Sequence, residues 1–330
     1  MVKRIILGSI TILIVVVALY VFFKTRPSGD INRYKDYYVN DSGNPDGSDI
    51  KVTFFGVSTL LLDDGETQIL IDGFFSRPSI AQALFTKIES DTAQIDRMIA
   101  KYKMDRVRGI FVTHSHYDHA FDAAYTTKRT GATLYGSVST LNIGRGGGLK
   151  EDQLSLYEPY REIQLGKFTM QVIPSKHSPG NAQKDDGIII DKPLAQPAKI
   201  KAYAEGGTFD FFIRHNRKSI YIKPSPNYVV GALDSLRADV LFIGIATVTY
   251  HPESWQEMYY GQTVGKLKPG LVIPLHWDDF FEPISDNLVM LPRLAGSSEK
   301  DFDFFINKTK ADKIDFRILQ GTRSIILFKE

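Results

Sequence analysis

The hydrophobic and polar positions divide the chain into an apolar first segment, a short polar stretch and a long alternating region. Within residues 5–23 only Ser9, Thr11 and Tyr20 carry polar side-chain groups. As a helix this run is about 28 Å long, close to the hydrocarbon thickness of a bilayer. The bulky residues after it are unsuited to signal-peptide cleavage. We therefore predict an uncleaved transmembrane anchor over 5–23, preceded by a basic tail at 1–4, with a cleaved signal peptide as the alternative.

The orientation of this anchor follows less directly from the sequence. Lys3 and Arg4 precede the apolar run, and Lys24 and Arg26 follow it. The positive-inside rule counts basic residues near both ends and does not decide between them. A tail of a few residues most simply stays in the cytoplasm. We therefore expect a single-pass membrane protein whose main domain lies on the extracytoplasmic face.

Residues 24–49 are rich in Pro, Gly, Asp, Asn and Ser, which predicts a linker. Alternating β-rich runs begin at residue 50, and turn residues at 63–65 and 214–218 indicate hairpins. Apolar residues recur at helical spacing over 78–102, with Ser79 as the cap. This pattern predicts one α/β domain over 50–330, with two packed sheets flanked by helices. The expected strands cover 51–55, 58–62, 68–72, 106–112, 132–136, 167–173, 208–213, 219–222, 239–245 and 271–274, and further helices cover 121–128 and 255–266.

Composition narrows the chemistry. The chain has 40 basic and 38 acidic side chains and a net charge of +2, so it shows no nucleic-acid footprint. Its hydrophobic content of 43% is enough for a substantial core. Cysteine is absent, which excludes disulfides, thiolate zinc sites and iron–sulfur ligation. Any metal ligands must therefore come from His, Asp and Glu.

Residues 113–119 read Thr-His-Ser-His-Tyr-Asp-His and follow the apolar run 109–112. A strand that ends in such a cluster brings nitrogen and oxygen donors to one point, as a divalent metal requires. The alternative is a histidine-rich solvated loop. The cluster predicts a metalloprotein, with four donors at His114, His116, Asp118 and His119.

The chain resembles the metallo-β-lactamase fold superfamily over about residues 50–330. The resemblance rests on the His-x-His-x-Asp-His motif, on Ile71-Asp72-Gly73 closing an early strand, and on His177 and His276 after later strands. It implies a four-layer αβ/βα sandwich. It also implies a first metal site of His114, His116 and His177, and a second of Asp118, His119 and His276.

One position departs from the superfamily pattern. An acid that bridges two metals usually follows the strand matching 219–222, but here the chain reads Lys-Pro-Ser-Pro-Asn and Ser225 stands in its place. A neutral hydroxyl is a poor bridge between two cations. We therefore expect one firmly bound Zn²⁺ and a weakened second site, with Mn²⁺ or Fe as alternative metals. Asp278 and Asp279 are the nearest acids that could compensate.

The resemblance implies a metallo-β-lactamase-superfamily hydrolase that uses a metal-bound hydroxide to cleave an ester, lactone, amide or phosphodiester. Asp118 would ligate the second metal or act as the base, and His276 would ligate it or stabilise an oxyanion. With the anchor, this predicts a membrane-bound hydrolase of a small or amphiphilic substrate, without a nucleic-acid partner; the oligomeric state stays open. The alternatives are a catalytically silent, metal-stabilised binding domain and a nuclease of the same fold.

Several other features have less specific interpretations. His215 and His251 are expected at the surface or in packing, although His251 keeps the alternative of facing the cleft. Tyr117 is expected to pack rather than contact substrate. Gly144–Gly148 is expected to be a flexible loop near the cleft mouth, and 180–199 is expected to be a specificity insert.

Overall fold

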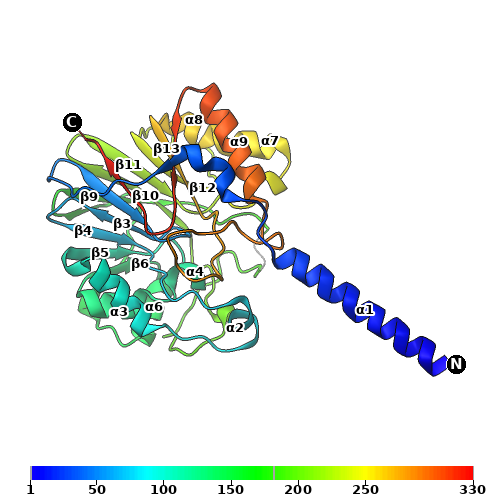
Figure 1. Ribbon diagram of the computed structural model, residues 1–330. Coiled ribbons are helices and arrows are strands. Elements are labelled where there is room, and N and C mark those ends of the chain that lie inside the picture. Colours follow the sequence, from blue (N-terminus) through cyan, green and yellow to red (C-terminus); the bar gives the residue numbers. More distant parts are fainter. Residues whose placement is uncertain (1, 181–182, 330) are drawn as a thin grey trace.

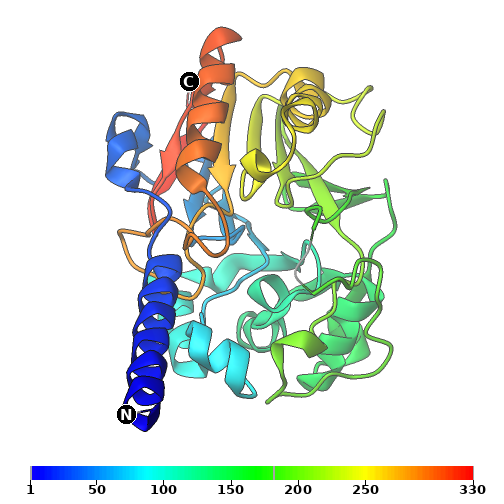
Figure 2. The same cartoon turned by 90° about the vertical axis from the view of Figure 1, so that its right-hand side faces the viewer.

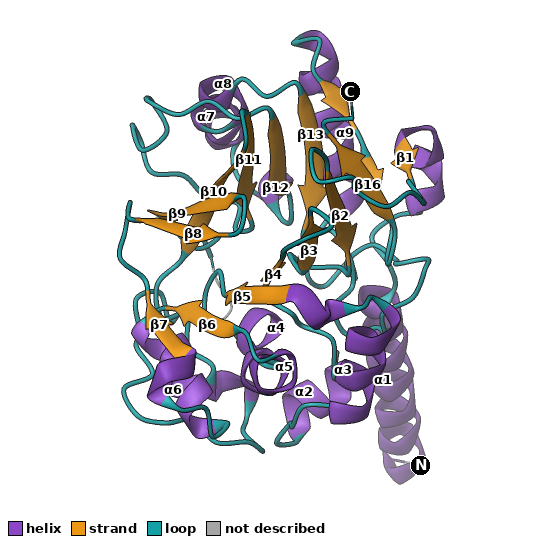
Figure 3. Cartoon of the chain, turned by 90° about the vertical axis from the view of Figure 1, so that its left-hand side faces the viewer, coloured by secondary structure: helices purple, strands orange, loops and turns teal. Residues whose placement is uncertain are grey.

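Two seven-stranded sheets pack face to face in the computed structural model, which describes residues 2–180 and 183–329 (Figures 1 and 3). The first sheet has the spatial order β16 (Ser324–Leu327), β2 (Ile50–Phe54), β3 (Leu60–Asp63), β4 (Gln68–Ile71), β5 (Val107–Phe111), β6 (Thr133–Gly136) and β7 (Leu154–Leu156). The second has the order β14 (Asp315–Phe316), β13 (Leu271–Leu275), β12 (Val240–Gly244), β11 (Lys218–Lys223), β10 (Phe209–His215), β9 (Phe168–Pro174) and β8 (Glu162–Leu165). A separate pair joins β1 (Tyr38–Val39) to β15 (Ile318–Leu319).

Helices cover the outer face of each sheet (Figure 3). The first sheet carries α2 (Ile80–Phe85), α3 (Thr92–Lys101), α4 (Tyr117–Ala120), α5 (Ala123–Thr130) and α6 (Val138–Gly146). The second carries α7 (Glu253–Gln262), α8 (Val264–Leu267) and α9 (Ser298–Ala311). The predicted arrangement of two packed sheets flanked by helices is confirmed.

The core between the sheets explains why they pack. Inward-facing side chains of both sheets form one large buried cluster. Phe111 of β5 belongs to this cluster, with its ring centroid 4.4 Å from that of Tyr135 and 5.8 Å from that of Phe211 in the opposite sheet. Burying each such side chain contributes about 1.5–3 kcal/mol. This packing fixes the strand ends, and so the loops that follow them, in space.

Two local expectations were wrong. The helix predicted over 78–102 is two helices, α2 and α3, because the chain between them extends and Ile88 pairs with Ala198. The glycine-rich stretch is not a flexible loop, because α6 continues to Gly146. A Cβ at Gly146 would lie 2.0 Å from the carbonyl oxygen of Leu194. That glycine therefore permits close contact with the 180–199 insert.

The first helix, α1 (Val2–Thr25), extends away from the body (Figures 1 and 2). Its end is hydrogen-bonded to the body, since the Arg293 amide donates to the Arg26 carbonyl at 2.9 Å and the Leu294 amide to the Lys24 carbonyl at 2.9 Å. Beyond it, Tyr34 stacks on Phe302 of α9 at 5.0 Å, so part of 24–49 packs on the domain.

Within the described part of the chain, no helix combines the length and apolarity needed to cross a membrane. The transmembrane helix expected over 5–23 is thus not found among the described residues, and membrane anchoring stays a prediction. Met1 of the basic tail, Asn181 and Ala182 of the insert, and Glu330 lie outside the described residues, as do the side chains of residues 2–7.

A buried ion pair joins the loop after β4, which contains Arg77, to the loop after β13, which contains Asp278. The Arg77 guanidinium lies 2.8 Å from the Asp278 carboxylate, and both side chains are fully buried. Arg77 also donates to the Phe55 carbonyl at 3.0 Å and to the Asp279 carbonyl at 3.2 Å. Removing one partner of such a pair destabilises the fold, because the other partner is left as an uncompensated buried charge.

We expect Arg77→Met to lower the free energy of unfolding by about 3–5 kcal/mol, because it isolates the Asp278 charge. Urea unfolding measures this. The matched control is Arg129→Met, which removes an exposed ion pair with Asp96 and should change stability by about 1 kcal/mol or less. Equal losses in the two variants would contradict the assignment.

Candidate metal centre

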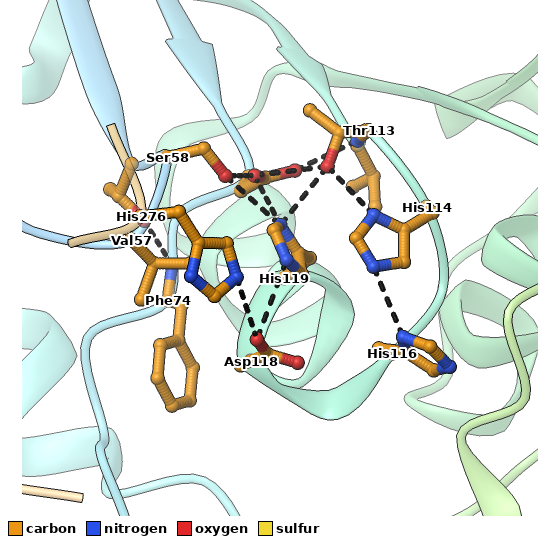
Figure 4. Close-up of polar contacts among 12 residues, drawn as sticks. Val57, Ser58, Phe74, Thr113, His114, His116, Asp118, His119 and His276 are labelled. Atoms are coloured by element: carbon orange, nitrogen blue, oxygen red, sulfur yellow. Dashed lines mark hydrogen bonds and ion pairs between the residues drawn. The ribbon is translucent and has the colours of Figure 1, made fainter. Parts of the chain in front are cut away.

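The metal-ligand candidates gather where strands of both sheets end, and Figure 4 shows five of them: His114, His116, Asp118, His119 and His276. β5 ends at Phe111, and the motif follows it directly into the single turn of α4. His177 follows β9 and His276 follows β13. The sandwich thus brings together side chains from three distant stretches of sequence, in the two groups that the resemblance implied.

The first group consists of His114, His116 and His177, whose ligand atoms lie within 4.8 Å of one another. His114 Nε2 is 3.1 Å from His116 Nδ1. Burial, reinforced by the neighbouring imidazoles, lowers the pKa of His114 well below its ordinary value and that of His177 to about 4. These two imidazoles are therefore neutral at pH 7, the state that a metal ligand requires.

The second group consists of Asp118, His119 and His276, again within 4.8 Å. One oxygen of Asp118 lies 3.4 Å from Nε2 of each histidine. Burial on its own would raise the pKa of Asp118, but the His119 and His276 side chains outweigh it and hold that pKa well below the usual range. His119 Nε2 is buried without a hydrogen-bond partner, although it points into this group.

Asp72 sets the orientation of His119. Its carboxylate is 2.8 Å from His119 Nδ1 and also accepts hydrogen bonds from the Ser58 hydroxyl and the Thr113 amide (Figure 4). Because Nδ1 is held by this carboxylate, Nε2 faces the other two members of the group. Burial alone lowers the pKa of His119, but Asp118 and Asp72 outweigh it and raise that pKa to about 10.

The backbone around the site is strained. Val57, Asp72 and His276 all adopt left-handed conformations, with φ of 54°, 58° and 58°. Such residues cost on the order of 1–3 kcal/mol each and persist only where the surroundings enforce them. Here the His276 amide donates to the Val57 carbonyl at 2.7 Å, and the Val57 amide donates to Asp278 at 2.7 Å. This interlocking holds the His276 ring over Asp118.

The donor chemistry fits metal ions. Two groups of three converging donors, with the neutral imidazoles of His114 and His177 in one and a buried nitrogen of His119 without a hydrogen-bond partner in the other, match the ligand preferences of zinc. Their role as ligands stays a prediction. Ser225 is buried near this edge. Asp118 is the one carboxylate that either group contains among the described residues.

Asp278 and Asp279 do not compensate for the missing acid, contrary to expectation. The Asp278 carboxylate is taken up by Arg77 and the Val57 amide. The Asp279 carboxylate accepts from the Phe281 amide at 3.0 Å, and burial raises its pKa to about 6. Neither acid joins a metal-binding group among the described residues.

The other residues considered from the sequence, His215, His251 and Tyr117, have packing contacts and belong to neither ligand group. His215 Nε2 lies 3.0 Å from the buried Asp64 carboxylate. The His251 ring lies 4.3 Å from that of Trp255 and belongs to neither group. Tyr117 is buried between Phe74 and Phe280. These positions agree with the packing roles expected from the sequence.

The polar residues behind the histidines could not be assigned from the sequence. Ser58 and Thr113 each place a hydroxyl 3.0 Å from His119 Nδ1, and Asp185 contacts His116. Asp72 was noted only as part of the resemblance, without a role. The Asp72-Gly73 pair directly after an apolar run is a sequence signal for a turn at this point, and the structure shows that both residues adopt the left-handed conformation.

The sequence model of the metallo-beta-lactamase superfamily matches residues 52–244. The chain belongs to this superfamily. It is 26% identical over 224 residues to a UPF0173 metal-dependent hydrolase of Heliobacterium modesticaldum, covering 64% of this chain and 82% of the relative. It is 24% identical to a UPF0173 metal-dependent hydrolase of Anaeromyxobacter sp. (strain K), and this match covers 83% of this chain and 86% of the relative. The relatives' names and the shared superfamily support a metal-dependent hydrolase.

Solved structures show the same fold. The metallo hydrolase Igni18 of Ignicoccus hospitalis aligns with a TM-score of 0.52 at 14% identity, covering 86% of this chain and all of that one. The metallo-beta-lactamase fold protein YhfI of Bacillus subtilis aligns with a TM-score of 0.52 at 12% identity, covering 84% and 99%. An isothiocyanate hydrolase from Delia radicum gut bacteria aligns with a TM-score of 0.52 at 15% identity, covering 83% of this chain and 98% of that one.

The two groups should differ in proton release on binding zinc. In the metal-free protein at pH 7.5, His114 and His177 are neutral, whereas His119, with a pKa of about 10, carries a proton. Filling the second group should therefore release about one proton more than filling the first, and its affinity should rise with pH between 6.5 and 8.5. Calorimetry in buffers of different ionisation enthalpy measures this. Equal release for both equivalents would contradict the prediction.

Proposed function

We propose that this protein is a membrane-anchored hydrolase that cleaves an ester, lactone, amide or phosphodiester bond at a two-part zinc centre. The observation that carries the proposal is the adjacency of the two ligand groups, since the ring centroids of His114 and His119 are 3.9 Å apart. Mn²⁺ or Fe are the alternative metals. Five imidazoles and one carboxylate favour zinc, which binds nitrogen well.

Bound cations would polarise the substrate and lower the pKa of water to about 7. The protein's own groups would orient the reactants. The Asp118 side chain is 11% exposed and carries its charge at neutral pH, so it can accept a proton from an attacking water. The His276 side chain is 16% exposed beside it and can ligate or donate to developing negative charge.

One observation favours a second candidate, a catalytically silent, metal-stabilised binding domain. The second group has three ligands, with Ser225 where an acid is usual. Assays with chromogenic esters and phosphodiesters, with and without added zinc or manganese, separate the two candidates. Metal-dependent turnover supports the enzyme, and metal binding without any turnover supports the binding domain.

We expect His116→Ala to abolish both metal binding at the first group and turnover, because His116 contributes one of three ligands. Elemental analysis of the purified protein and the chromogenic assay measure the two effects. His251→Ala is the control and should retain both, since His251 belongs to neither group. A wild-type protein without stoichiometric metal would overturn the proposal.

Support for the anchor comes from the apolar run over 5–23 and from its large hydrophobic residues between Ile10 and Phe23, which are 49–67% exposed. Basic side chains lie at its base: Arg26 stacks over Phe22 at 4.1 Å, and Arg293 over Phe23 at 4.7 Å. Aromatic and basic residues together are typical of a membrane interface. Anchoring on the extracytoplasmic face would favour an amphiphilic substrate.

We expect Val16→Asp to move the full-length protein from the membrane fraction to the soluble fraction. A carboxylate at the centre of a spanning helix costs about 2.5–3.5 kcal/mol. Carbonate extraction followed by immunoblotting measures the distribution. Val16→Leu keeps the helix apolar and should stay in the membrane. Wild-type protein in the soluble fraction would contradict the anchor.

A further inference from the structure

The segment after His177 lies against the metal centre and is fixed there. The buried Glu205 carboxylate accepts from the Gly187 amide at 2.9 Å, and the Gly206 amide donates to the Ile188 carbonyl at 3.0 Å. Further along, the Ile190 amide donates to a hydroxyl of α6 at 2.8 Å. These bonds hold residues 187–190 in one position relative to the motif.

This position brings Asp185 to His116. Both oxygens of the Asp185 carboxylate lie 3.2 Å from His116 Nε2, and one also accepts from the Glu205 amide at 3.1 Å. The His116 side chain is only 7% exposed and the Asp185 side chain only 13%. The contact is thus enclosed, and its geometry is set by groups outside the pair.

The two nitrogens of His116 face different partners. Nδ1 lies 3.1 Å from His114 Nε2, inside the first ligand group, whereas Nε2 faces Asp185. A neutral imidazole has one proton, and a carboxylate at Nε2 holds that proton there. The lone pair of Nδ1 is then directed into the ligand group.

We propose that Asp185 is a positioning residue that fixes the tautomer and orientation of His116 and thereby strengthens metal binding at the first group. This inference rests on the proposed metal centre. It assigns to the insert a role in holding the metal, in addition to the specificity role expected from its sequence.

Charge supports the same assignment. The first group has three imidazoles and no acid of its own, so a bound dication would have no counter-charge within it. Asp185 supplies this counter-charge from the opposite side of the His116 ring. The next residue, Asp186, lies 3.9 Å from His177 Nδ1 with its side chain 64% exposed. Because solvent screens it, Asp186 contributes less and provides a matched control.

The test compares D185N and D186N in the full-length protein, with zinc alone as the probe. Competition with a chromophoric chelator measures affinity without reference to activity. We expect D185N to bind the first zinc about 10–100-fold more weakly and D186N to stay within about twofold of wild type. Equal affinity of D185N and wild type would overturn the inference.

A second measurement is decided in the wild-type protein, so its outcome does not depend on how the variants fold. Long-range ¹⁵N–¹H correlation of the metal-free wild-type protein reports the tautomer of His116. We expect the proton on Nε2 in the wild type and on Nδ1 in D185N, where the amide donates to Nε2 instead. A wild-type proton on Nδ1 would overturn the inference. Failure of the wild type to bind any zinc would instead overturn the proposed function.

Discussion

The buried carboxylate of Asp72 is the interaction on which the site depends. It sits in a left-handed turn after β4 and accepts hydrogen bonds from the Thr113 amide at the end of β5 and from Ser58 after β2. It also holds His119 Nδ1. A buried charge is tolerated only where such donors satisfy it, so its presence forces these three segments together. The arrangement of the motif loop follows from this one anionic centre.

The same constraint links stability to function. Left-handed residues at Val57, Asp72 and His276 surround the centre, and the Arg77–Asp278 pair holds two of their loops in place. Each strained residue opposes folding, and the surrounding hydrogen bonds and the packed sheets offset it. Functional sites commonly store strain that the rest of the fold maintains. A sandwich with this much buried aromatic surface can maintain it.

The clustering of the histidine motif at the strand ends could be predicted because it rests on local patterns: a dense histidine cluster after an apolar run, and single histidines after later strands. The contacts behind them could not. The hydroxyls of Ser58 and Thr113 and the carboxylate of Asp185 acquire meaning only when segments distant in sequence meet. The break between α2 and α3 was missed for a similar reason, because the pairing of Ile88 with Ala198 overrides the local helical periodicity. The glycines at 144–148 predict a flexible loop, whereas at Gly146 the close approach of the Leu194 carbonyl explains why a residue without a Cβ is needed.

The weak second site expected from Ser225 stays a prediction, and the charge distribution around that site acts in the opposite direction. The second group has Asp118 within it and Asp72 one imidazole behind it. Together these carboxylates raise the pKa of His119 from 6.5 to about 10, which corresponds to roughly 5 kcal/mol of preference for a positive charge at that position. A dication replacing the proton meets the same field. Ser225 therefore removes a charged ligand that the two groups would share, whereas Asp118 and Asp72 still supply negative charge beside a second cation.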